Sequence, residues 1–220
     1  MPHGTVISLM SAAMAQRAGI LGYNRRMSPS HVAENNGAMP RPKMLLHVCC
    51  APCSAHVTGE LAQNHQMILY FFNPNIHPRE EYERRRDEAR RWAEGEGIEF
   101  IEEPYRPEEW FARTKGMENE PEKGARCRAC FDIRMEAAAA KASQMGADIF
   151  GAALSVSPHK RAEDINTAGN AAGGRAGVPF MAADFKKREG FKLAMKKARE
   201  LGLYRQDYCG CIYSMRKNKG

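Results

Sequence analysis

The sequence contains no apolar run that approaches the roughly 18 residues required by a membrane-spanning helix. Its first residues do not combine a charged segment with a clean apolar core, so no secretory signal is indicated. Internal repeats are absent, and the alanine run at 137–140 is the only low-complexity tract. The composition is that of a globular protein, since 43% of the 220 residues are hydrophobic and 27% are charged.

The chain also lacks the even number of cysteines that a closed disulfide framework needs. We therefore expect a cytoplasmic protein, because clustered cysteines in a reducing compartment serve more often as metal ligands or catalytic thiols than as bridges. The seven cysteines fall into the groups "CCAPC", "CRAC" and "CGC", which contain Cys49, Cys50, Cys53, Cys127, Cys130, Cys209 and Cys211.

Acidic residues are scarce in one segment, which accounts for the whole net charge of +7. Residues 184–220 contain eleven Lys or Arg residues but only four Asp or Glu residues. A basic C-terminal surface favours a polyanionic partner such as RNA. The alternative interpretation is a lysine-rich helix face whose charges are simply solvated.

Residues 1–42 have no sustained hydrophobic period, and we interpret them as a flexible N-terminal extension. From residue 43 onwards, strand and helix patterns alternate, which predicts a single α/β domain over 43–220. We expect a mostly parallel, five-stranded sheet with helices on both faces. The predicted strands span 43–49, 65–73, 98–104, 147–154 and 178–184, and the predicted helices span 52–63, 77–97, 106–116, 127–146, 160–177 and 185–202.

Reactive side chains follow several of the predicted strands. In a parallel sheet, ligands bind beyond the carboxyl ends of the strands, so these side chains are expected to converge at one edge. The glycine-rich loops that bind phosphates are missing there, because "HVCCAPCS" is neither a P-loop nor a pyrophosphatase loop. The residues expected at this edge are Cys49, Cys50, Cys53, Asn73, Pro74, Asn75, Ser155, Ser157, Lys160 and Asp184.

The number and spacing of the cysteines favour a metal centre of more than one part. A structural zinc ion or an iron–sulfur cluster needs four ligands, and a redox dithiol needs two cysteines. A cluster beside a second metal or reactive site would use all seven cysteines. A zinc-stabilised RNA-binding module without catalysis, a thiol–disulfide oxidoreductase and an ATP-dependent tRNA thiolase are the alternatives.

Together, "LLHVCCAPCS", "FFNPNIHPREEYERR", "CRACFDIRMEAAAAKA", "ALSVSPHK" and "GLYRQDYCGCIYS" resemble the QueH family of epoxyqueuosine reductases over about residues 43–215. The resemblance implies a Rossmann-like fold similar to the adenine-nucleotide α-hydrolases. It implies reduction of epoxyqueuosine to queuosine at the wobble position of tRNA, with a 4Fe–4S cluster and an additional iron ion. The cysteines that match the family's ligands are Cys49, Cys50, Cys127, Cys130, Cys209 and Cys211, and Cys53 is a further metal-ligand candidate.

Removing an epoxide oxygen takes two electrons and two protons, so the site needs a proton donor. Asp184, Lys160 and Tyr208 are the candidate catalytic residues. His47 is a fourth candidate proton donor, and the alternative is that it is a buried histidine of the core. A ferredoxin- or flavodoxin-type protein is the expected electron donor. The aromatic residues that could stack on a splayed tRNA base are Trp110, Phe185, Tyr204 and Tyr208.

Overall fold

The computed structural model describes residues 40–215, and the predicted N-terminal extension lies almost wholly outside these described residues. Four strands form one parallel sheet in the order β3-β2-β1-β4. The strands are β1 (Lys43–His47), β2 (Gln66–Phe71), β3 (Glu99–Glu102) and β4 (Ile149–Ala152).

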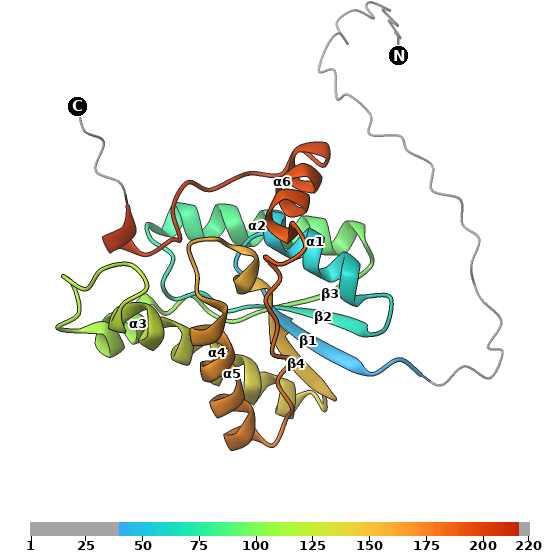
Figure 1. The fold of residues 1–220 in the computed structure, drawn as a ribbon, viewed down its shortest axis with the longest axis horizontal. Coiled ribbons are helices and arrows are strands. Elements are labelled where there is room, and N and C mark those ends of the chain that lie inside the picture. The colour runs from blue at the N-terminus through green and yellow to red at the C-terminus, as the bar shows by residue number, and fades with distance from the viewer. Residues whose placement is uncertain (1–39, 216–220) are drawn as a thin grey trace, which may run out of the picture. The chain divides into compact units, whose positions relative to one another are not determined.

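The helices cover both faces of this sheet, as the alternating pattern predicts. α1, α2 and α6 lie on one face, whereas α3, α4 and α5 lie on the other (Figure 1). Among residues 40–215, no helix is long and apolar enough to cross a bilayer. The helices are α1 (Ala51–Leu61), α2 (Arg79–Gly95), α3 (Pro107–Thr114), α4 (Ala125–Gln144), α5 (Ala162–Ala176) and α6 (Gly190–Glu200), with 3₁₀ turns η1 (Ala153–Val156) and η2 (Ile212–Ser214).

The predicted fifth strand is wrong, because residues 178–184 form only an isolated parallel bridge between Phe180 and Phe150 of β4. The backbone does run beside β4: Phe150 N–H donates to the carbonyl of Pro179, and Met181 N–H donates to the carbonyl of Phe150. Pro179 has no N–H of its own to continue a ladder, and only this one bridge forms. The position of the segment was therefore predicted correctly, but its extent was not.

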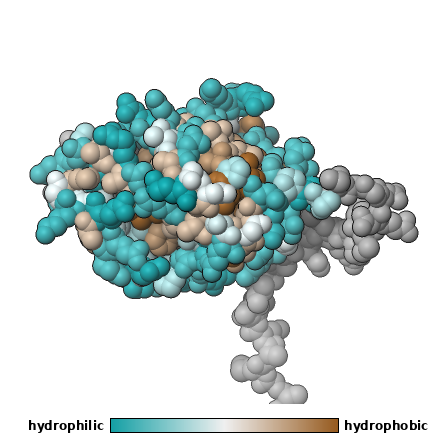
Figure 2. Space-filling view, turned by 90° about the horizontal axis from the view of Figure 1, so that it is seen from below, coloured by the Kyte–Doolittle hydropathy of each residue, from teal (hydrophilic) through white to brown (hydrophobic). Residues whose placement is uncertain are grey.

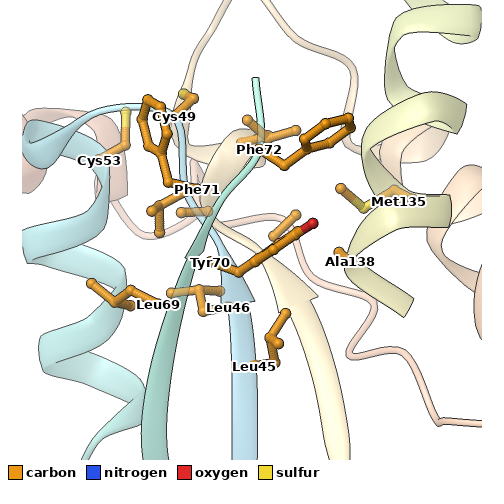
Figure 3. Close-up of a cluster of buried hydrophobic side chains, with 14 of the residues drawn as sticks. Leu45, Leu46, Cys49, Cys53, Leu69, Tyr70, Phe71, Phe72, Met135 and Ala138 are labelled. Atoms are coloured by element: carbon orange, nitrogen blue, oxygen red, sulfur yellow. The ribbon is translucent and has the colours of Figure 1, made fainter. Parts of the chain in front are cut away.

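Alternating side chains of the strands fill the core on both sides of the sheet. Figure 3 shows Tyr70 and Phe72 pointing from β2 and its end toward Met135 on α4, whereas Leu69 points toward the opposite face. The central strand β1 is buried almost along its whole length, as expected for a strand that is covered by helices on both faces. This core fixes the carboxyl ends of the strands, from which the cysteine-bearing segments depart.

The molecular surface on the α4 and α5 side is mixed in character. Figure 2 shows hydrophilic side chains around the margin of this face and hydrophobic ones gathered toward its middle.

Candidate metal centre and active site

The first group of cysteines lies where β1 passes into α1. Cys50 is the residue that precedes α1, and Cys53 lies in the first turn of that helix. The sulfur atoms of Cys49 and Cys50 are 3.9 Å apart, and all three side chains are buried. In Figure 3, Cys49 and Cys53 lie at the end of the hydrophobic core toward which the strands point.

The second group is on the first turns of α4. Cys127 and Cys130 are separated by three positions, so their side chains share one face of the helix. The backbone N–H of Lys123 donates to the sulfur of Cys127 over 3.2 Å. This arrangement directs hydrogen-bond donors from the helix start toward the thiol.

The third group lies in the segment 208–211, here called the cysteine loop. Gly210 has φ of +106°, and a Cβ at this position would lie 2.8 Å from Cγ1 of Ile76. The carbonyl of Gly210 accepts a hydrogen bond from the backbone N–H of His77 over 2.8 Å. Glycine is therefore required both by the left-handed backbone and by the close approach of the loop after β2.

The tertiary structure brings the second and third groups around one narrow cavity of about 40 Å³. Four cysteines from segments about 80 residues apart line it, and Asn75, Trp110 and Lys160 complete part of its wall. The four cysteines are Cys127, Cys130, Cys209 and Cys211.

A wider cavity of about 530 Å³ adjoins the narrow one, and both are lined by Lys160 and Cys209. Cys53 and Tyr208 also line the wider cavity. Gln206, another lining residue, donates from Nε2 to the sulfur of Cys50 over 3.1 Å. The first cysteine group is thus connected to the other two through this wider space.

All seven cysteines are free thiols. Most of those whose pKa is shifted have a raised pKa, which keeps the thiol neutral. The contact with Cys49 favours the Cys50 thiolate, but the hydrogen bond with Cys53 and burial outweigh it and raise the pKa of Cys50 to about 12. Burial likewise raises the pKa of Cys130. The exception is Cys209, whose pKa is lowered chiefly by the hydrogen bond from the Cys211 thiol.

This donor set fits an iron–sulfur cluster. Within residues 40–215, no three His, Cys, Asp or Glu side chains converge on a single ion position. A four-iron cluster is larger than one ion, so its thiolate ligands stand farther apart. Two buried N–H donors on the narrow cavity, Trp110 Nε1 and Arg126 Nε, have no partner among the described residues. Such donors are suited to hydrogen bonds with cluster sulfur atoms.

The candidate proton donors differ in position. Lys160 lines both cavities. Tyr208 lines the wider one, and its hydroxyl donates to the carbonyl of His77. Burial, followed by the nearby Glu81 carboxylate, raises the pKa of Tyr208 to about 12, so its hydroxyl remains protonated at neutral pH.

The other two candidates lie less favourably for proton transfer. Asp184 lines neither cavity, and its Oδ1 pairs with Nζ of Lys186 at 2.9 Å. Burial raises the pKa of Asp184, but the hydrogen bonds from Lys186 outweigh it and hold this pKa below its usual value. His47 is fully buried, its Nε2 lies 2.9 Å from the carbonyl oxygen of Phe72, and burial lowers its pKa to about 3.

Of the four predicted stacking residues, only Tyr208 lines the wider cavity. Trp110 is completely buried, and Tyr204 is occupied by a hydrogen bond to Glu81. Two aromatic residues that sequence reasoning missed, Phe191 and Tyr213, line this cavity instead. Their closeness in sequence to the basic helix and to Cys211 was the available signal.

Arg85 is another functional candidate that sequence reasoning missed. It lies on the buried stripe of α2 that also includes Tyr82, Ala89 and Trp92. An arginine on such a mostly apolar stripe is unusual, and this spacing was the signal that could have identified it.

Known proteins of similar sequence share one description. The sequence model of a family described as "Epoxyqueuosine reductase QueH" matches residues 44–217. The chain is 40% identical over 180 residues to the epoxyqueuosine reductase QueH of Streptococcus pyogenes serotype M1, covering 79% of this chain and 71% of that protein. Identity to the Acinetobacter baylyi protein of the same name is 43% over 176 residues, covering 79% and 81%.

The fold of this chain resembles that of a protein of known structure. It is described as "U34-tRNA thiolase NcsA from Methanococcus maripaludis with its [4Fe-4S] cluster", and the TM-score is 0.52 at 15% sequence identity. The match covers 81% of this chain and 63% of that chain. At this identity the likeness concerns the fold, which is that of the adenine-nucleotide α-hydrolase-like proteins.

Proposed function

The chain belongs to the QueH family of epoxyqueuosine reductases, and from this premise we propose how its own residues carry out the reaction. The protein is an oxidoreductase that reduces epoxyqueuosine to queuosine at the wobble position of tRNA, the last step of queuosine synthesis. The epoxide carbons become an alkene as two electrons and two protons are taken up, and the oxygen leaves as water.

The cysteines that would hold the metal are those gathered around the two adjoining cavities. Cys127, Cys130, Cys209 and Cys211 share the narrow cavity, Cys53 lines the wider one, and Cys50 contacts both Cys49 and Gln206 of the wider cavity. When bound, a 4Fe–4S cluster supplies single electrons, and an additional iron ion with an open position supplies a Lewis acid for the epoxide oxygen. The convergence of these distant cysteines is the observation that carries the proposal.

Among the predicted proton donors, Lys160 is the one that lines both cavities, and in this proposal it protonates the departing oxygen. The Tyr208 hydroxyl stays protonated and is the second candidate. Asp184 is held as a carboxylate by Lys186, so in this proposal it orders the segment before α6 and does not donate a proton.

The tRNA binds in this proposal along the basic helix α6, whose charge suits the phosphates of an anticodon stem. A low-potential protein of the ferredoxin or flavodoxin type delivers the electrons. We place the reaction in the cytoplasm, where seven free thiols remain reduced.

The test is anaerobic reconstitution with iron and sulfide, followed by incubation with tRNA from cells that lack epoxyqueuosine reductase. With a strong chemical reductant, nucleoside analysis should show epoxyqueuosine converted to queuosine. The Cys127→Ala, Cys130→Ala double variant should lose both iron and turnover, because it removes two of the four cysteines on the narrow cavity. Colourless protein that contains stoichiometric zinc, no sulfide and no activity would instead support the zinc-stabilised RNA-binding module.

A further inference from the structure

We propose that Phe191 and Tyr213 receive the wobble base of the tRNA between them in the wider cavity, as an aromatic clamp. This inference rests on the proposed function, because it assigns the place of the nucleoside whose epoxide is reduced. Both residues line the wider cavity together with Cys209 and Lys160. They come from different elements, the first turn of α6 and the turn η2.

The linings of the two cavities assign them different occupants. The wider cavity, of about 530 Å³, falls within the roughly 300–1,000 Å³ typical of small-molecule sites. The narrow cavity is lined by the four cysteines that would hold the metal. A splayed nucleoside therefore enters the wider cavity and approaches the cysteines at the wall that the two cavities share.

The two aromatic rings are accessible to such a nucleoside. Phe191 is 37% exposed and Tyr213 is 39% exposed, although both lie beside a cavity that leads to buried cysteines. Exposed aromatic side chains on which unpaired bases stack are the usual means by which proteins bind single-stranded RNA.

The Tyr213 ring is also held in place before any RNA binds. The guanidinium of Arg126 lies 5.0 Å from the Tyr213 ring centroid, and the Trp110 ring lies 5.9 Å away with a tilt of 31°. A ring that is already fixed loses little conformational freedom when a base stacks on it.

A polar group inside the cavity complements the stacking surfaces. Gln206 lines the wider cavity, and its Oε1 is buried without a partner among the described residues. The base of queuosine is guanine-like and presents N–H donors on its Watson–Crick edge. An unpaired amide oxygen in the lining of the cavity is suited to such an edge.

Cations at the cavity and on α6 are suited to the phosphates on either side of the splayed base. Arg205 lines the cavity, and α6 carries further lysines away from its first turn, whereas Glu122 and Asp207 contribute carboxylates to the lining. The phosphates are therefore assigned to Arg205 and α6, and the base to the two aromatic rings.

The test uses the reconstituted enzyme with Phe191→Leu and Tyr213→Leu, which keep apolar bulk but remove the aromatic face. Each variant should raise the KM for tRNA roughly fivefold or more, in line with about 1–3 kcal/mol for one stacked base. Iron and sulfide content and the rate at saturating tRNA should be unchanged, and Phe191→Trp and Tyr213→Phe should restore the KM. Phe111→Leu is the matched control, because Phe111 is 40% exposed on α3 and does not line the cavity.

A second measurement separates base stacking from phosphate contacts. The leucine variants should weaken tRNA binding without changing the slope of log Kd against log salt, because no charge is removed. Unchanged KM in both leucine variants of an active wild-type enzyme would overturn the clamp alone. The clamp would also be overturned if the leucine variants lost iron and Phe191→Trp and Tyr213→Phe lost it as well. The two rings would then have a structural role. A wild-type protein without iron or without turnover would instead overturn the proposed function.

Discussion

Arg85 on α2 is joined to the cysteine loop through Cys209, whose carbonyl oxygen accepts a hydrogen bond from the arginine Nη1 over 3.2 Å. The arginine Nη2 donates to the carbonyl of Tyr208 over 3.1 Å, and the Glu81 carboxylate pairs with the guanidinium at 2.7 Å. The Arg85 side chain is only 1% exposed. A buried cation on α2 therefore fixes a loop that has no regular secondary structure and that carries two of the cysteines.

Replacing Arg85 is expected to destabilise the protein and to impair its metal binding. Arg85→Gln leaves the Glu81 carboxylate without its buried partner, which costs about 3 kcal/mol or more. The free energy of unfolding measured in urea and the iron content after reconstitution should both be lower than in the wild type. Arg79→Gln is the control, because Arg79 and Glu83 are exposed and 3.8 Å apart, and the loss should stay within about 1 kcal/mol. Full iron content in Arg85→Gln would contradict the positioning role.

The proton donor can be identified from reaction rates at saturating tRNA. Lys160→Gln should lower kcat roughly 100-fold or more while iron content is retained, because general acid catalysis typically contributes that much. Asp184→Asn should change kcat little, since Asp184 lines neither cavity. The measurement is single-turnover conversion of epoxyqueuosine. Equal losses in both variants would show that the assignment of Lys160 is incorrect.

The basic face of α6 should determine how salt affects tRNA binding. Lys192→Gln and Lys196→Gln each remove one exposed cation, so each should reduce the salt slope of binding by about 1. Arg175→Gln is a matched control: Arg175 is equally exposed but lies at the C-terminal end of α5, away from the edge that carries the cysteines. A reduced slope in the control, or an unchanged slope in the α6 variants, would contradict this placement of the RNA.

Acid should destabilise the protein through His77. Burial lowers the pKa of His77 from 6.5, and its Nε2 is buried without a partner among the described residues. As the pH falls, the unfolded chain therefore takes up a proton before the folded protein does. The contribution of neutral His77 to the free energy of unfolding is fully present above pH 6.5. It is lost as the pH falls below 6.5, with a slope of up to about 1.4 kcal/mol per pH unit.

His77→Asn tests this dependence, because asparagine can donate toward the Tyr105 hydroxyl, which lies 3.1 Å from Nδ1 of His77, but cannot titrate. The free energy of unfolding, measured from pH 7.5 to 5, should decline less steeply in the variant. His65→Asn, in the turn between α1 and β2, is the control variant. Identical slopes for His77→Asn and wild type would show that His77 does not titrate in this range.

Local sequence patterns predicted most of the regular elements. The predicted helix over 77–97 corresponds to α2 (Arg79–Gly95), and the predicted strand over 65–73 corresponds to β2 (Gln66–Phe71). The predicted helix over 185–202 begins five residues later, at Gly190, because Arg188 and Glu189 have positive φ. A left-handed backbone depends on tertiary packing, and hydrophobic periodicity does not reveal it.

The sequence by itself determined the alternation of strands and helices, the seven thiols and their spacing, and the likeness to a family, because these depend on local periodicity and residue identity. Only the tertiary structure decided which of these thiols meet, that Arg85 holds the cysteine loop, and that Phe191 and Tyr213 line the wider cavity. Contacts such as that of Arg85 with Cys209 join residues 124 positions apart. They arise from the packing of whole helices and loops on the sheet, and no short stretch of sequence specifies that packing.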